Sequence, residues 1–281
     1  MAAATSGPSS NAASLADLRD LAISDEPDRY FAATLAPAVL RYDLIVLAAF
    51  AAEIARVPGQ VREPLAGEIR LQWWRDALIG GSSEAAAGHP VATAMRATMR
   101  RFGLPAEVVV GVIDAQADVF HGERPVDEKA LRARLAASEG GLFRLAAHIC
   151  AAGSQDAQTA NLAGFTYGLS RALLPARDDE VAPSLIPRSI LADANFAHGG
   201  AEERSTFRAL IDLAHAAHAD VAARMRQMSR RQRLAYLPLA MVKPNLHALE
   251  REYGQEYSRS NDAPRIARLL RIGWAHVSGR I

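Results

Sequence analysis

The segment Val39–Val57 constrains the fold more than any other part of the chain. Its residues are apolar on nearly every side of a helix, and Pro58-Gly59 follows it directly. In a soluble protein such a helix has to be surrounded by other helices. The run Leu44–Ala52 is too short to span a bilayer, because Glu53 and Arg56 end it. The segment therefore predicts a helix at the centre of a helical core.

The composition supports an all-α fold. Alanine dominates, whereas Val, Ile, Tyr and Phe are sparse. Alanine is the best helix former, and β-branched and aromatic residues favour strands. Prolines and glycines separate helical segments, and no repeat, strand alternation or low-complexity linker divides the chain. Gly164 and Gly168 lie at a spacing that permits a close helix contact. We expect one domain of about ten helices.

The stretch Glu68–Asp76 is the densest group of large and charged side chains. Pro64 and Gly80 suit the start and the end of a helix of about four turns around it. Two of the three tryptophans lie here, beside acid, amide and guanidinium groups on one face. The pattern suits a cavity or docking surface, and the alternative is a surface helix with salt bridges and two anchoring tryptophans. The candidate residues are Arg56, Glu68, Arg70, Gln72, Trp73, Arg75 and Asp76, and none is assigned as catalytic.

Two acidic pairs are weak candidates for a metal site. Asp114 and Asp118 are four residues apart, which places two carboxylates on one face of the helix expected over Pro105–His121. Asp178 and Asp179 lie in a proline-rich, charged stretch. Carboxylates are suitable Mg²⁺ ligands. A single pair of acidic residues is, however, also explained by a solvated helix face.

Charge and motifs exclude several protein classes. The 32 basic and 31 acidic residues give a formal charge of +1, so no overall field attracts nucleic acid. The common nucleotide-binding, hydrolase and zinc-protease motifs are absent from the sequence. Residues Met1–Ala16 lack the basic and apolar regions of a secretory signal. The basic cluster Arg224–Arg233, followed by the apolar segment Leu234–Val242, suits either a peripheral membrane contact or a solvated helix face.

Four segments together resemble the squalene/phytoene synthase family. They are Asp28-Arg-Tyr30, Ala48–Arg56, Val61–Asp76 with its Trp-Trp pair, and Leu185-Ile-Pro187. The likeness is greatest to the divergent branch that includes a mitochondrial respiratory complex I assembly factor and its alphaproteobacterial relatives. The resemblance implies an all-α isoprenoid synthase-type helical bundle around a central cavity.

The resemblance also implies where metal-binding aspartates should stand. Active members condense two prenyl diphosphates, with Mg²⁺ held by two aspartate-rich motifs. Aligning the first motif on Ala49-Phe50 places its first and last aspartates at Ala55 and Gly59, and neither is acidic. The second motif is replaced by the stretch Arg171–Glu180. This chain therefore departs from the family pattern at both metal motifs.

These observations predict a non-catalytic binding or assembly factor of the type that serves respiratory complex I biogenesis. An active prenyl transferase with Mg²⁺, using Asp114, Asp118, Asp178 and Asp179, is the first alternative, and an isoprenoid-binding protein is the second. We expect no cofactor otherwise. The partner is a protein or an isoprenoid lipid, not nucleic acid. The expected location is the cytoplasm, with a peripheral contact at the inner face of the inner membrane as an alternative. Residues 1–24 form a tail with a short helix, residues 25–250 the helical domain and residues 251–281 a C-terminal extension.

Overall fold

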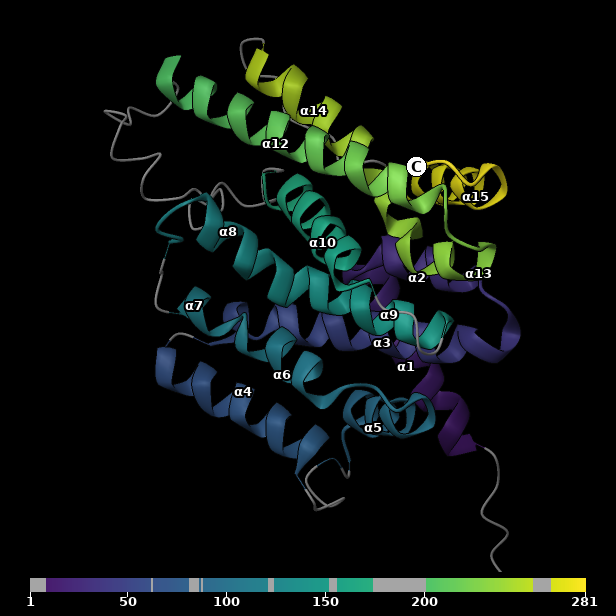
Figure 1. The fold of residues 1–281 in the computed structure, drawn as a ribbon. Helices are drawn as coiled ribbons and strands as arrows, with labels where there is room; N and C mark the ends of the chain where they lie inside the picture. Colours follow the sequence, from purple (N-terminus) through teal and green to yellow (C-terminus); the bar gives the residue numbers. More distant parts are fainter. Residues whose placement is uncertain are drawn as a thin grey trace, which may run out of the picture.

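The computed structural model describes residues 9–61, 63–80, 86, 88–120, 124–151, 156–173, 201–254 and 264–281. Every regular element in these ranges is a helix, so the all-α prediction is confirmed for them (Figure 1). No helix in the described ranges is long and apolar enough to cross a membrane. The helices are α1 (Ser9–Asp25), α2 (Pro27–Thr34), α3 (Ala38–Arg56), η1 (Pro58–Gln60), α4 (Pro64–Ile79), α5 (Pro90–Phe102), α6 (Ala106–Asp114), α7 (Ala117–Phe120), α8 (Glu128–Leu135), η2 (Ala136–Gly140), α9 (Gly141–Cys150), α10 (Ala157–Ala172), α12 (Ala201–Met225), α13 (Arg230–Arg233), η4 (Leu234–Met241), α14 (Val242–Gly254) and α15 (Arg265–Ser278).

Helix α3 is the central helix that the apolar segment predicts. It begins after Pro37 and packs against α1, α2, α5 and α9. Val46, Ala48 and Phe50 are completely buried. The first of these neighbours, α1, covers α3 in part with its buried Leu18, so residues 9–24 of the N-terminal segment are helical and partly packed on the core.

Helix α4 lies at the edge of the molecule, on the side away from α12 and α14 (Figure 1). Pro64 occupies its first turn and Gly80 follows its last residue, as the sequence predicts. Its core-facing side chains are Leu71, Trp74 and Ala77. The charged side chains of α4 stand on the outer surface, together with the exposed Leu65, Ile69 and Ile79.

Helix α10 makes a close backbone contact with the π-helical turn η2. A Cβ atom on Gly164 would lie 2.1 Å from the backbone N of Gly140, and one on Gly168 would lie 2.8 Å from the Leu135 side chain. The predicted close contact at these two glycines is therefore confirmed. It brings α10 close enough for its side chains to meet those of η2.

The C-terminal part of the chain folds back onto the core. The segment Leu234–Met241 is a 3₁₀ helix rather than part of a longer α-helix, because Pro238 within it cannot donate a backbone hydrogen bond. Nearly all of its side chains are buried, so it packs inside the protein and does not form a membrane-facing surface. Helix α15 packs against η4 and α2.

Candidate functional site

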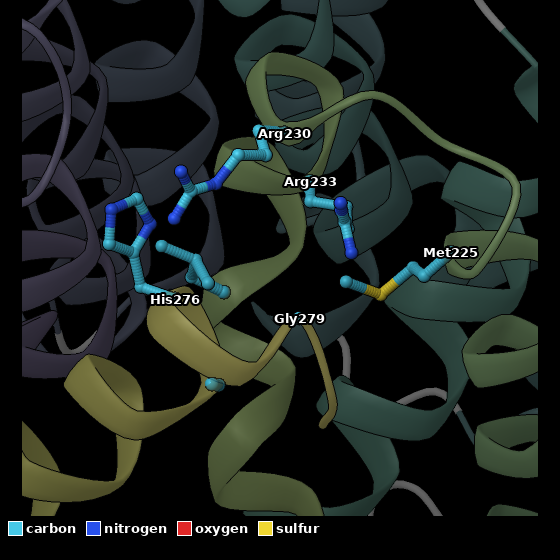
Figure 2. Close-up of a pocket in the computed structure, with 7 residues that line it drawn as sticks. Met225, Arg230, Arg233, His276 and Gly279 are labelled. Atoms are coloured by element: carbon cyan, nitrogen blue, oxygen red, sulfur yellow. The ribbon is translucent and has the colours of Figure 1, made fainter.

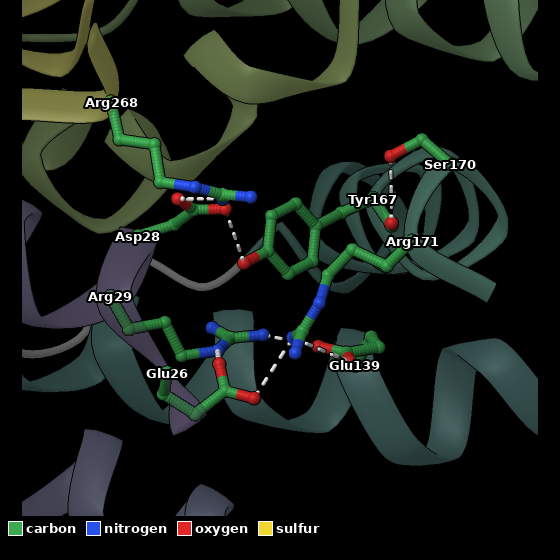
Figure 3. A network of polar contacts seen from close by, with 8 residues as sticks. All are labelled: Glu26, Asp28, Arg29, Glu139, Tyr167, Ser170, Arg171 and Arg268. Atoms are coloured by element: carbon green, nitrogen blue, oxygen red, sulfur yellow. Dashed lines mark hydrogen bonds and ion pairs between the residues drawn. The ribbon is translucent and has the colours of Figure 1, made fainter. Parts of the chain in front are cut away.

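A cluster of charged side chains is buried where α2, η2, α10 and α15 meet (Figure 3). Glu26 precedes α2, which supplies Asp28 and Arg29, and the other members come from helices more than a hundred residues further along the chain. We call this group the buried ion cluster. Its members are Glu26, Asp28, Arg29, Glu139, Tyr167, Arg171 and Arg268.

Two arginines and two glutamates form one half of the cluster. Arg29 donates from Nε to Glu26 Oε2 at 3.1 Å, and its Nη2 also contacts Glu139. Arg171 Nη1 lies 2.9 Å from Glu26 Oε1 and 3.6 Å from Glu139 Oε1. Each arginine therefore contacts both glutamates, which gives a closed arrangement instead of two separate ion pairs.

The other half is built on Asp28. Arg268 Nη1 donates to Asp28 Oδ1 at 2.6 Å, and the Tyr167 hydroxyl donates to Asp28 Oδ2 at 3.2 Å. The guanidinium groups of Arg29 and Arg171 each lie 5.2 Å from the centre of the Tyr167 ring. Tyr167 thus connects the two halves through a hydrogen bond at one end and cation–π contacts on its ring.

The electrostatics follow from burial and from these partners. Burial raises the pKa of Glu26, although Arg171 and Arg29 oppose this effect. Burial also disfavours the charged form of Arg171, but Glu26, Tyr167 and Glu139 raise its pKa well above the ordinary value. The pKa of the Tyr167 hydroxyl is raised well above 10 by burial and by Asp28. The cluster contains three carboxylates and three guanidinium groups, so it carries no surplus of either charge.

A pocket of about 190 Å³ opens beside the cluster. Asp25, Asp28, Arg171 and Arg268 contribute to its wall, together with Asn245 from α14. The Asn245 side chain is buried, and its Nδ2 has no hydrogen-bond partner among the described residues. The pocket is smaller than the roughly 300–1,000 Å³ of typical small-molecule sites. It suits a small polar molecule or a few waters.

Arg56 contacts one of the residues that line this pocket. Its Nε donates to Asp25, which is one of the wall residues, and this hydrogen bond raises the pKa of Arg56. Of the residues that the sequence singled out, Arg56 is therefore connected to the pocket through Asp25.

The other candidates lie on α4. Glu68, Arg70, Gln72 and Asp76 are exposed, whereas Trp73 is half-buried. Trp73 lies edge-on to its buried neighbour Trp74, with ring centres 5.1 Å apart. These residues form an outer surface, and their predicted role in docking stays a prediction.

A chain of surface hydrogen bonds joins α4 to α6. Arg75 donates from Nη1 to Gln72 Oε1 at 2.7 Å and from Nε to Asp114 Oδ1 at 2.6 Å. Gln72 donates in turn to Asp76 Oδ1 at 2.9 Å. The polar face predicted on α4 is thus a connected network.

The Asp114–Asp118 pair differs from its expected geometry. The helix expected over Pro105–His121 is interrupted, because α6 ends at Asp114 and the turn hydrogen bond from Gln116 N to Ile113 O precedes α7. Asp114 contacts Arg75, and Asp118 lies 3.9 Å from Arg134. The two carboxylates are therefore engaged by different arginines. Asp178 and Asp179 lie outside the described residues.

Sequence reasoning missed most of the buried ion cluster. Its ion pairs join residues up to 240 positions apart, so no local pattern reveals them. The available signal was the presence of charges in apolar surroundings, such as Arg171 at the end of the apolar helix Ala157–Ala172. A buried charge requires a partner, but the sequence does not say which one.

Comparisons with known proteins identify the family of this chain and two solved structures with a similar fold. A sequence model of the family described as "Squalene/phytoene synthase" matches residues 25–269. The chain belongs to this family. The fold is similar to the crystal structure of squalene synthase HpnC from Alicyclobacillus acidocaldarius, with a TM-score of 0.71, 16% identity and coverage of 89% of this chain and 98% of that one. It is also similar to a dehydrosqualene synthase crystallised with a ligand, with a TM-score of 0.78, 12% identity and coverage of 96% and 98%. No curated protein sequence matches the chain.

The described part of this squalene/phytoene synthase-family chain does not provide a magnesium site. Ala55 and Gly59, the positions aligned with the first aspartate motif, have no ligand atoms in their side chains and are exposed. Within the described ranges, no three His, Cys, Asp or Glu residues are grouped closely enough to hold a metal ion. The carboxylates of the buried ion cluster contact arginines, whose charge competes with that of a cation.

Proposed function

We propose that this protein is a non-catalytic member of the squalene/phytoene synthase family that acts as a binding factor in the assembly of respiratory complex I. The observation that carries the first part is the buried ion cluster. Three guanidinium groups neutralise three carboxylates in the interior of a fold that elsewhere hosts diphosphate condensation. The second part extends the resemblance to the assembly-factor branch of the family.

The charge balance of the cluster supports the loss of condensation. Departure of a diphosphate from a prenyl chain develops negative charge, which active sites stabilise with clustered cations. In this protein Arg29 and Arg171 are held by Glu26 and Glu139, so their positive charge is already compensated. The neighbouring pocket is also small for a molecule with a long isoprenoid chain.

The surface of α4 supports a docking role. It presents exposed Arg70 and Asp76 beside the hydrogen-bonded residues Gln72 and Arg75. The half-buried Trp73 anchors this face to the core through its contacts with Trp74. Charged groups held on a rigid helix can select a partner by charge complementarity.

An activity assay tests the catalytic part of the proposal. The purified protein is incubated with farnesyl diphosphate or geranylgeranyl diphosphate and Mg²⁺, with an active squalene synthase as the positive control. We expect no squalene or phytoene above the background without enzyme. Formation of either product at enzyme-like turnover would overturn the proposal in favour of a prenyl transferase.

A genetic experiment tests the assembly part. Deletion of the gene should lower complex I activity and leave the cellular isoprenoid profile unchanged. Complementation with R70E/D76K should restore less activity than the wild type, because the exposed charges of α4 are reversed. The matched control R100E/E107K reverses exposed charges on α5 and α6 and should complement fully. An altered isoprenoid profile with normal complex I activity would contradict the assembly role.

A further inference from the structure

Helix α15 carries an apolar stripe on its exposed side. Its large apolar side chains are more exposed than most of those elsewhere in the described residues. The exposed members are Ile266 (72%), Leu269 (40%), Leu270 (66%), Trp274 (71%) and Val277 (70%). At 100° per residue, four of them fall within an arc of about 80°, and Leu269 widens the arc to about 140°. We call these five residues the α15 stripe.

The opposite side of the same helix attaches it to the protein. Arg268, Ile272 and Ala275 are buried and pack against α2 and η4. Arg268 is further fixed by its ion pair with Asp28. Because packing of the helix is satisfied by this second face, the α15 stripe is not needed to hold α15 in place. An exposed apolar strip of this length indicates a surface that contacts something else.

The charged side chains of α15 itself all have one sign. Arg265 and Arg271 are exposed and flank the stripe on its two sides. The sequence Arg265–Ser278 contains no Asp or Glu. Basic flanks on an apolar helix face are the pattern of helices that lie in the interface of an anionic membrane.

A second basic element lies beside the C-terminal end of α15. Figure 2 shows Arg230 and Arg233 of α13 next to His276 and Gly279, where they line a small pocket together. The sequence Arg230–Arg233 also lacks Asp and Glu. Basic side chains therefore also lie at the C-terminal end of α15.

We infer that α15 is a membrane-docking helix, which lays the α15 stripe into the interface of a bilayer that contains anionic lipid. Charge complementarity selects this occupant, because the surrounding arginines match lipid phosphates and repel a basic protein surface. Trp274 suits the same environment, since tryptophan favours the boundary between headgroups and acyl chains. The family match ends at residue 269, so Leu270, Trp274 and Val277 lie beyond it. The inference is independent of the assembly role.

Vesicle binding by the full-length protein tests this inference. Flotation is measured with vesicles of phosphatidylcholine alone and of phosphatidylcholine mixed with phosphatidylglycerol. We expect binding to the mixed vesicles, weak binding to phosphatidylcholine and a loss of binding as salt is raised. The variant L270Q/W274Q should bind the mixed vesicles at least about tenfold more weakly than the wild type does, because two apolar groups of the stripe are removed.

The matched control is L65Q/I69Q on α4. Leu65 and Ile69 are 64% and 63% exposed and are also four residues apart, but they lie on a helix far from α15 in Figure 1. This control should bind vesicles like the wild type. Circular dichroism should give both variants the helix content and melting temperature of the wild type, since all four side chains are exposed.

Tryptophan fluorescence gives a second readout. Trp274 is exposed, whereas Trp74 is buried and Trp73 is packed beside it. Vesicle binding should therefore shift the emission to shorter wavelength, and W274F should bind with a much smaller shift. Equal vesicle binding by the wild type and L270Q/W274Q, or no binding by either, would overturn the inference. A dimer that L270Q/W274Q converts to a monomer, without vesicle binding, would instead identify the stripe as an interface between two copies.

Discussion

At the scale of single residues, Arg29 is a buried charge that is held by two carboxylates. It is buried, contacts Glu26 and Glu139, and lies 4.8 Å from the centre of the Phe143 ring. Replacement of one partner in a buried ion pair leaves the other charge without compensation, which costs about 3–5 kcal/mol. We therefore expect R29M to lower the free energy of unfolding by this amount in urea denaturation.

Two further variants separate the effect of losing a buried, paired charge from the general effect of replacing an arginine. R224M removes the exposed ion pair with Asp156 and should cost less than about 1 kcal/mol. R29M/E139Q removes a carboxylate along with its partner, so it should be more stable than the sum of the single variants predicts. Strict additivity of the two changes would contradict the coupled arrangement in the buried ion cluster.

At the scale of elements, the contact between α10 and η2 positions Tyr167 and Arg171. A Cβ on Gly164 would overlap the backbone of Gly140, which cannot move as a flexible side chain does. We expect G164A to destabilise the protein by about 1–3 kcal/mol or more, since overpacking forces a backbone shift. The control G111A has no atom within 4 Å of the added Cβ and should be neutral or slightly stabilising. Thermal melting of both variants measures the difference, and equal melting temperatures would contradict the contact.

The helices themselves could be predicted because their determinants are local. The apolar run of α3 and the Pro64 and Gly80 boundaries of α4 are visible in a short window of sequence. The break between Asp114 and Ala117 was missed, because it is a short turn, closed by the hydrogen bond from Gln116 N to Ile113 O, with no proline or glycine to mark it in the sequence. The α15 stripe was also missed, since only the packing of Ile272 and Ala275 reveals which apolar face of the helix remains exposed.

At the scale of the whole molecule, burial of ionisable groups makes stability depend on pH in two opposing ways. The pKa of Glu26 is raised by burial, so the folded state binds more protons than the unfolded state above the ordinary pKa of 4.5. The contribution of Glu26 to the free energy of unfolding therefore falls as pH rises above 4.5. His218 on α12 acts in the opposite direction, because burial and Lys243 lower its pKa from 6.5 to about 4. A pH profile of the wild type alone therefore does not isolate either group.

The difference between the wild type and H218Q isolates the histidine. The unfolded chain protonates His218 near pH 6.5 and the folded protein only near pH 4, so folding is favoured above pH 6.5 and this stability is lost as pH falls. Between roughly pH 7 and pH 5 the wild type should lose about 2 kcal/mol more stability than H218Q. The control H247Q replaces an exposed histidine on α14 and should follow the wild type. Parallel pH profiles for the wild type and H218Q would contradict the burial of a neutral His218 on α12.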